Sequence, residues 1–350
     1  MKAIDALNEA NKIAFSPFVF QTVYTMLELG ILEAIHSAKN GISIKEIENK
    51  TNVSEYGIRV LCEMAESAQI IEQKTENKYS TTKIGFFIVN DKMTLINLYF
   101  TQDVCYNGLY YLKESILNSK PEGLKVFGNW KTIYEGLASL PDKVKKSWFD
   151  FDHFYSDNSF DDALKIIFKN KPKKIFDIGG NTGKWSIACT KFNKEVNVTM
   201  FDLPGQINVA KKNIEKIKSI SNRIEYQKID LLNPNSKIPE GADVYWMSQF
   251  LDCFSEEEIE KILLKIKENM SVNAKIYIME TFIDDQRFKA ASHSLIATSL
   301  YFTALANGNS KMYSSSVMKY IVNKAGFKCI NEHHLKENSF HTILELELKK

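Results

Sequence analysis

The chain has 350 residues, of which 44% are hydrophobic and 25% charged, and its formal net charge at pH 7 is +2. The length suggests two domains, and the near-neutral charge gives no argument for a nucleic acid or an anionic membrane as partner. The five cysteines lack metal-ligand or redox spacing, and no run approaches the ~18 apolar residues that span a bilayer. We expect no signal peptide and a cytoplasmic location.

The first third of the chain predicts a winged helix. Residues 5–36 carry apolar side chains near helical spacing, Ser54 is a plausible N-cap of a later helix, and residues 70–72 with 78–82 predict a two-stranded wing. The helix that would read DNA, residues 54–67, carries three glutamates and one arginine. A DNA-binding helix should be basic, so this composition argues against a nucleic-acid function.

Residues 92–165 predict further helices with an aromatic cluster near their end. The cluster, residues 148–155, is interrupted by Asp150, Asp152 and His153. A fully apolar core would accept such polar groups only if they were paired. The cluster therefore suggests a ligand-facing helix in addition to ordinary core packing.

A short buried strand then ends in three glycines, Gly179, Gly180 and Gly183, and a helix start follows at Lys184. Glycines at a strand-to-helix turn let the backbone bend sharply and approach a ligand, and the helix N-terminus presents unbonded N–H groups. Asp177 precedes the glycines at the end of the strand, where its carboxylate could face a cationic group. The spacing is not that of the dinucleotide-binding Gly-x-Gly-x-x-Gly motif.

Each of the next four predicted strands ends in polar residues. The strands cover residues 196–201, 224–229, 242–247 and 274–279, and the residues at their ends are Asp202, Asp230, Ser248 with Gln249, and Glu280. Parallel strands bind ligands at their carboxyl ends, and an acid about 20 residues after the glycines is placed to bind ribose hydroxyls. Alternatively, Asp202 and Asp230 are ordinary turn residues.

Four motifs in this region resemble the S-adenosylmethionine-dependent O-methyltransferases of the plant caffeate/flavonoid and bacterial polyketide type. They are Asp-Ile-Gly-Gly-Asn-Thr-Gly at 177–183, Phe-Asp-Leu-Pro at 201–204, Asp-Leu at 230–231 and Leu-Asp-Cys-Phe-Ser-Glu-Glu at 251–257. The resemblance implies an α/β class I methyltransferase with a Rossmann-like doubly wound sheet. It also implies a winged-helix dimerisation domain over residues 1–100, a catalytic domain over 101–350 whose helices at 101–165 roof the pocket, and a homodimer.

The implied cofactor is S-adenosylmethionine, which leaves as S-adenosylhomocysteine, and no metal is expected. In the family's arrangement the glycines approach the amino-acid moiety, Asp202 accepts the ribose hydroxyls and Ser248 reaches the carboxylate end. The full set of cofactor-binding residues implied by the resemblance is Asp177, Gly179, Gly180, Gly183, Asp202, Leu203, Asp230, Leu231, Ser248 and Gln249.

The implied acceptor is a small aromatic, phenolic metabolite. The pocket residues that the resemblance suggests are His153, Phe154, Tyr155, Phe302 and Met312.

The chain departs from the family's pattern at the residue that acts as general base. Asp252 stands where plant members have a histidine, Glu280 matches one partner acid, and Met312 replaces the second.

Three mechanisms remain open. Asp252 deprotonates a phenol with Glu280 as its partner, or proximity alone suffices for an acidic phenol, or the acceptor is an activated aromatic carbon. A structural alternative is that Asp252 only caps the helix at 255–270. A further alternative is a non-catalytic S-adenosylmethionine-binding regulator that contacts DNA.

Overall fold

The computed structural model of the chain describes residues 1–75, 77–335 and 339–349. It divides into two compact units, Met1–Gln102 and Asp103–Lys350, each with its own core. The sequence predicts the domain boundary after residue 100, two residues before this division. No helix in the described residues has both the length and the apolar character needed to cross a membrane.

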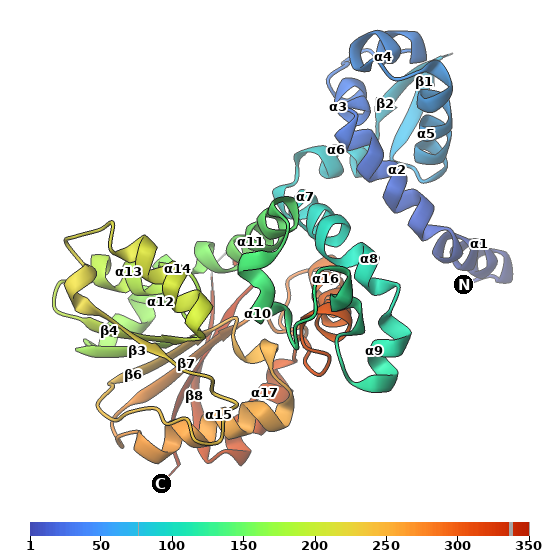
Figure 1. Cartoon of the computed structure of the whole chain (residues 1–350). Helices are drawn as coiled ribbons and strands as arrows, with labels where there is room; N and C mark the ends of the chain where they lie inside the picture. Colours follow the sequence, from blue (N-terminus) through green and yellow to red (C-terminus); the bar gives the residue numbers. More distant parts are fainter. Residues whose placement is uncertain (76, 336–338, 350) are drawn as a thin grey trace. The chain divides into compact units, whose positions relative to one another are not determined.

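The N-terminal unit consists of helices and one antiparallel hairpin (Figure 1). Its elements are α1 (Ala3–Ala14), α2 (Ser16–Glu28), α3 (Ile31–His36), α4 (Ile44–Thr51), α5 (Glu55–Ser67), β1 (Ile71–Thr75), β2 (Lys78–Thr81), α6 (Lys83–Asn90) and α7 (Lys92–Phe100). Ser54 accepts a hydrogen bond from the N–H group of Gly57, which confirms the predicted N-cap of α5. The order of helices followed by a hairpin is that expected of a winged helix, and residue 76 of its loop lies outside the described residues.

Two aromatic side chains at the junction of α1 and α2 are exposed to solvent. Phe15 and Phe18 are 56% and 64% exposed, and their rings lie 5.6 Å apart at the junction of α1 and α2. They are therefore surface residues and not part of the internal core.

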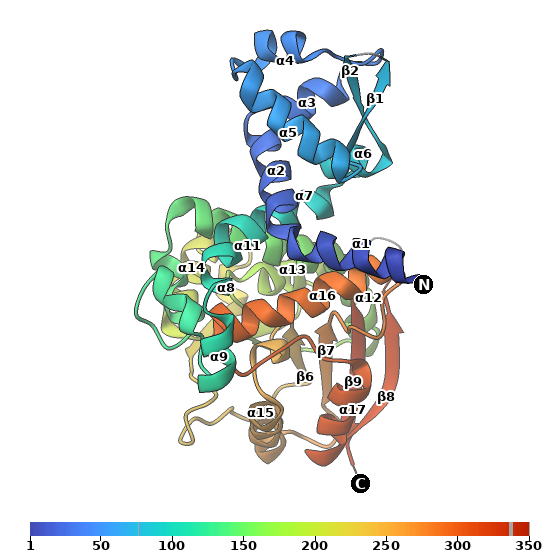
Figure 2. The same cartoon turned by 90° about the vertical axis from the view of Figure 1, so that its right-hand side faces the viewer.

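The second unit is built on a seven-stranded sheet with the order β5-β4-β3-β6-β7-β9-β8. The strands are β3 (Lys174–Ile178), β4 (Asn197–Asp202), β5 (Ile224–Lys228), β6 (Val244–Ser248), β7 (Lys275–Glu280), β8 (Phe327–His334) and β9 (Thr342–Leu348). The first five strands of this order are parallel, and β9 runs antiparallel between β7 and β8 (Figure 2). The chain order reverses between β3 and β6, where open α/β sheets bind ligands.

Helices cover both faces of this sheet (Figure 1). One core holds the buried faces of α12 (Phe160–Ile167), α13 (Lys184–Phe192) and α14 (Pro204–Ile214), and the other holds those of α15 (Glu256–Asn269) and α17 (Ser315–Lys324). Side chains of β6 alternate between the two cores because successive residues of a strand point to opposite faces. The α/β sheet with helices on both faces confirms the predicted fold class.

Further helices stand beyond the carboxyl ends of the parallel strands. They are α8 (Tyr106–Leu109), α9 (Leu112–Asn118), α10 (Ile133–Gly136), α11 (Asp142–Ser156), α16 (Lys289–Tyr301) and a π-helical segment, η8 (Phe302–Ala306). They pack closely, since a Cβ atom on Gly108 would lie 2.3 Å from a methyl carbon of Leu305. The indole nitrogen of Trp148 on α11 donates a 2.8 Å hydrogen bond to the hydroxyl of Tyr301 on α16.

Candidate functional site

The structure brings the predicted polar strand ends together at one edge of the sheet. The parallel register pairs Ile178 at the end of β3 with Phe201 and Met247 on its two neighbours. Backbone hydrogen bonds continue beyond the strands, from the N–H group of Gly179 to Phe201 and from that of Gln249 to Met279, both 2.9 Å long. The ends of β5, β4, β3, β6 and β7 therefore follow one another in space.

The glycine turn fits closely into its surroundings. A Cβ atom on Gly179, whose φ is +77°, would lie 2.2 Å from the Phe250 ring. A Cβ atom on Gly180 would lie 2.7 Å from Met200 and 2.9 Å from a carboxylate oxygen of Asp177. Bare backbone is therefore required here, and α13 begins directly after the turn with Gly183 as its N-cap, as predicted.

Asp202 connects the end of β4 to the glycine turn. One carboxylate oxygen accepts a 2.8 Å hydrogen bond from the N–H group of Asn181, and the other accepts a 2.7 Å bond from that of Leu203. Burial raises the pKa of Asp202 to about 6, although both hydrogen bonds oppose the shift. A carboxylate has about four lone-pair sites, so two remain for further donors such as ribose hydroxyls.

Asp177 lies beneath the same turn. It is buried, and the hydroxyl of Ser186 on α13 donates a 2.5 Å hydrogen bond to its carboxylate. Burial, with a smaller contribution from the neighbouring Asp202 carboxylate, raises the pKa of Asp177 to about 7, although the hydrogen bond from Ser186 opposes the shift. Nothing in the sequence marked Ser186, a buried residue in the first turn of α13, as a partner of Asp177.

Asp230 and Leu231 follow β5 in different environments. Asp230 is exposed and accepts a 2.9 Å hydrogen bond from the N–H group of Leu232, as a turn residue does. Leu231 is buried in the core that includes α15. The hydrogen bond of Asp230 agrees with the turn interpretation, and its exposed carboxylate is also open to a ligand.

Gln249 is a polar residue at this edge with an unsatisfied side-chain oxygen in the described part of the chain. Its amide oxygen is buried and has no hydrogen-bond partner within the described residues, and its φ is +45°. A buried acceptor without a donor costs roughly 1–3 kcal/mol, and left-handed backbone at a non-glycine residue is concentrated at functional sites. An amino or hydroxyl group of a bound ligand would satisfy this oxygen. The edge therefore fits a nucleoside with an amino-acid tail.

A pair of buried acids lies at the ends of β6 and β7. Asp252 is in a 3-10 turn, Leu251–Cys253, and Ser255 caps α15, so the interpretation of Asp252 as the helix cap is wrong. Glu280 accepts hydrogen bonds from the N–H groups of Phe250 and Leu251, at 3.1 and 2.9 Å, through one oxygen. Its other oxygen is buried without a partner in the part of the chain that is described.

The two acids differ in how readily they ionise. Burial raises the pKa of Asp252 to about 6. Burial raises the pKa of Glu280 well above its ordinary value, and the nearby Asp252 carboxylate raises it further. Glu280 is therefore the harder of the two acids to ionise, which makes Asp252 the stronger candidate for a base.

The helices beyond the sheet contribute several predicted pocket residues. His153 lies 3.6 Å from the carboxylate of Asp152, which accepts a 3.2 Å hydrogen bond from the side chain of Asn181 in the glycine turn. Helix α11 is thereby linked to the cofactor side of the site. Tyr155 is buried and packs against the ring of Phe154, 5.3 Å between centroids.

Phe302 and Met312 are both buried. Phe302 begins the π-helical segment η8, a kind of distortion frequently found at functional sites. The N–H group of Met312 donates a 3.1 Å hydrogen bond to the hydroxyl of Ser299 on α16. The thioether of Met312 cannot replace the hydrogen bonding of a carboxylate, so the base arrangement is reduced to Asp252 and Glu280.

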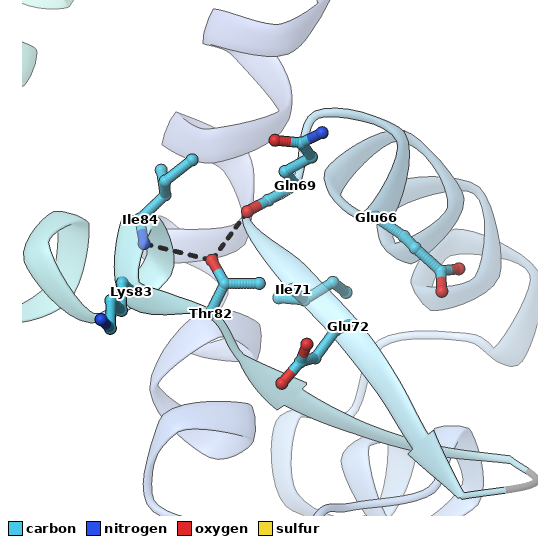
Figure 3. A pocket seen from close by; sticks show the side chains of 7 residues that line it. All are labelled: Glu66, Gln69, Ile71, Glu72, Thr82, Lys83 and Ile84. Carbon is cyan, nitrogen blue, oxygen red and sulfur yellow. Dashed lines mark hydrogen bonds between the residues drawn. The ribbon is translucent and has the colours of Figure 1, made fainter.

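A separate surface pocket of about 390 Å³ lies in the N-terminal unit (Figure 3). It is lined by Glu66, Gln69, Ile71, Glu72, Thr82, Lys83 and Ile84. Figure 3 shows the hydroxyl of Thr82 bonded to the carbonyl group of Gln69 and the N–H group of Ile84, so this residue caps α6. None of these residues belongs to the predicted site.

Comparison with known proteins gives two family matches. Residues 8–79 match a Dimerisation2-like domain, and residues 110–328 match an O-methyltransferase domain. The dual O-methyltransferase/FAD-dependent monooxygenase of Cercospora beticola is 24% identical over 291 residues, which are 74% of this chain and 31% of that protein. The chain thus spans less than a third of the length of that relative.

Two further similarities cover nearly the whole chain. The bacteriochlorophyllide d C-20 methyltransferase of Chlorobaculum tepidum is 21% identical over 335 residues, covering 93% of this chain and 94% of that protein. The crystal structure of the S-adenosylmethionine-dependent methyltransferase SibL has a TM-score of 0.73 at 18% identity, covering 98% of this chain and 100% of that one. The structural similarity confirms the class I methyltransferase fold.

Proposed function

Because this chain belongs to the O-methyltransferase domain family, we propose that it uses S-adenosylmethionine to methylate a hydroxyl group of a small aromatic, phenolic acceptor. The observation that carries the proposal is the convergence of the glycine turn, Asp202 and the buried acids Asp252 and Glu280 at one edge of the sheet. This convergence supports a cofactor site and a base side by side.

The residues at the sheet edge would hold the cofactor through complementary groups. Asp202 would accept the ribose hydroxyls with its remaining lone pairs, and the backbone of Gly179 and Gly180 would allow close approach of the amino-acid end. The buried amide oxygen of Gln249 would accept a hydrogen bond from that end, and Ser248 next to it would reach the carboxylate. When bound, the cofactor supplies a methyl group on a positively charged sulfur.

Asp252 would act as the general base. As an ionised carboxylate near pH 7, it would accept the proton of the acceptor hydroxyl and leave an oxygen anion as the nucleophile. Glu280, which ionises less readily, would hold the backbone of Phe250 and Leu251 by accepting hydrogen bonds from their N–H groups. Orientation of nucleophile and methyl donor supplies much of the remaining rate, roughly 7–11 kcal/mol for well-aligned groups.

The direct test has two parts. Calorimetry with S-adenosylhomocysteine should show binding to the full chain and loss of that binding in Asp202→Ala, whereas Asp142→Ala, a surface change, should leave it intact. Incubation with methyl-labelled S-adenosylmethionine and a panel of phenols should give methyl ethers. A chain that does not bind S-adenosylhomocysteine would end the proposal.

C-methylation is the second candidate, because the similar protein of Chlorobaculum tepidum is described as a C-20 methyltransferase. The two reactions give products that are easily separated. A labelled methyl group on oxygen is released as methyl iodide by hot hydriodic acid, which leaves the free phenol, whereas a methyl group on carbon is retained. Retention of the label by every product would replace O-methylation with C-methylation.

We also propose that the chain forms a homodimer through its N-terminal unit. The match to a Dimerisation2-like domain and the exposed rings of Phe15 and Phe18 support this assignment. Aromatic side chains are enriched in the centres of interfaces. Sedimentation velocity should show a dimer, and Phe18→Ser should shift the equilibrium toward the monomer without altering S-adenosylhomocysteine binding.

A further inference from the structure

One residue of the glycine turn carries a side chain at a position that favours glycine. This residue is Asn181, which lies between Gly180 and Gly183 and has a φ of +48°. Left-handed backbone is costly for most residues, and asparagine is among the few besides glycine that adopt it routinely. The turn therefore holds an amide side chain at little cost where glycine would satisfy the backbone.

Asn181 donates hydrogen bonds to carboxylates on two different elements. Its backbone N–H group bonds to Asp202 at the end of β4, at 2.8 Å, and its side-chain amide bonds to Asp152 on α11, at 3.2 Å. Any residue other than proline could make the first bond, but the second needs a side-chain donor. The bond to α11 is therefore a property of the asparagine side chain and not of the turn.

The bond to Asp152 holds the second half of α11. The first half is tied to Asp103 by a 2.6 Å hydrogen bond, which the hydroxyl of Ser147 donates to the Asp103 carboxylate. Asp152 lies further along the helix, and it is followed directly by residues 153–155, which the sequence predicts to line the pocket. Asn181 thus connects the segment that carries these predicted pocket residues to the edge of the sheet.

The setting of this bond distinguishes it from a surface contact of the same helix. The side chain of Asp152 is 25% exposed, and a carboxylate acceptor makes a stronger hydrogen bond than a neutral group does. The ion pair of Lys146 with Asp150 on α11 has side chains that are 75% and 50% exposed, so solvent screens it. The bond from Asn181 is therefore a contact that can position α11, and the ion pair serves as its comparison.

We infer that Asn181 is a positioning residue that makes the order of α11 depend on the cofactor. The inference rests on the proposed function and adds a link between the two halves of its site. Ribose hydroxyls bound to Asp202 fix the carboxylate that holds the Asn181 N–H group, and a fixed turn holds Asp152 more firmly through the asparagine amide. The cofactor thereby orders the predicted pocket residues on α11 and favours binding of the acceptor.

The test is hydrogen exchange on the full chain, with and without S-adenosylhomocysteine. In the unmodified chain, the ligand should slow exchange of the amides in residues 149–156 about tenfold. Asn181→Gly keeps the backbone bond to Asp202 and the left-handed turn but removes the side-chain donor. This variant should still bind S-adenosylhomocysteine, but the ligand should no longer slow exchange in residues 149–156. A purely structural contact would protect these amides equally with and without the ligand.

Asp152→Ala removes the other partner of the bond and should have the same effect. The double variant should lose no more protection than either single one, because both changes delete one contact. The matched control is Lys146→Ala, which removes the exposed ion pair of the same helix and should keep the ligand-dependent protection. Full protection in Asn181→Gly or in Asp152→Ala, or none in an unmodified chain that binds S-adenosylhomocysteine, would overturn the inference and leave the proposed function in place. A chain that does not bind S-adenosylhomocysteine would remove both.

Discussion

The proton bound to Asp202 should control cofactor affinity. A carboxyl group accepts two ribose hydroxyls well only when it is ionised, and burial holds the pKa of Asp202 at about 6 in the ligand-free fold. The folded-state pKa is above the ordinary value, so binding has to displace the proton at low pH. S-adenosylhomocysteine should therefore bind more weakly as the pH falls through 6.

The size of the effect follows from the ionised fraction. With a pKa of about 6, roughly one Asp202 in eleven is ionised at pH 5 and nearly all are ionised at pH 8. The affinity should therefore be about tenfold higher at pH 8 than at pH 5 on account of this residue, or about 1.4 kcal/mol. Asp177, whose pKa is about 7, adds a component at higher pH if its charge also assists binding.

The assay is titration calorimetry with S-adenosylhomocysteine between pH 5 and 8. Asp202→Asn should remove the component centred near pH 6 and weaken binding at pH 8 by about 1.5–3 kcal/mol, as expected for bonds to a charged acceptor. Asp142→Asn is the control, because its side chain is fully exposed. A flat profile in the unmodified chain, or the same profile in Asp202→Asn, would refute the reasoning.

Three further changes test other parts of the site. Methyl transfer should rise with pH around the pKa of Asp252, about 6, and Asp252→Asn should abolish this dependence; an unchanged rate in the variant would leave proximity as the mechanism. Gly179→Ala should lower the Tm and cofactor affinity, because its Cβ would meet Phe250 at 2.2 Å and left-handed backbone costs about 1–2 kcal/mol, whereas Gly205→Ala has open space and should do neither. The raised pKa of Asp177, about 7, means that the ligand-free fold loses stability as the pH rises from about 4 to 7. Asp177→Asn should therefore raise the ligand-free Tm at pH 8 but not at pH 4, and an equal gain at both values would contradict this sign.

Local patterns were enough to predict much of the cofactor side. The strand before Gly179, the helix after Gly183 and the cap at Ser54 appear within a few residues of their predicted positions. Each depends on interactions between residues close in sequence, such as a side chain that accepts a bond from an N–H group three residues later. The spacing of residues close together in the sequence is therefore enough to predict these elements.

The acceptor side could not be predicted in the same way. Trp148 and Tyr301 come from segments 153 residues apart, and their side chains meet only after the helices pack beyond the sheet. Only the structure excluded the alternative in which Asp252 caps α15, because it places Asp252 in the preceding 3-10 turn.

The sequence by itself determined the order of strands and helices, the glycine turn and the polar residues that end each strand, because these follow from local backbone preferences and hydrophobic periodicity. Only the tertiary structure decided that the carboxyls of Asp202, Asp252 and Glu280 have raised pKa values. Burial causes these shifts, and burial is a property of the packed chain, to which residues far apart in sequence contribute.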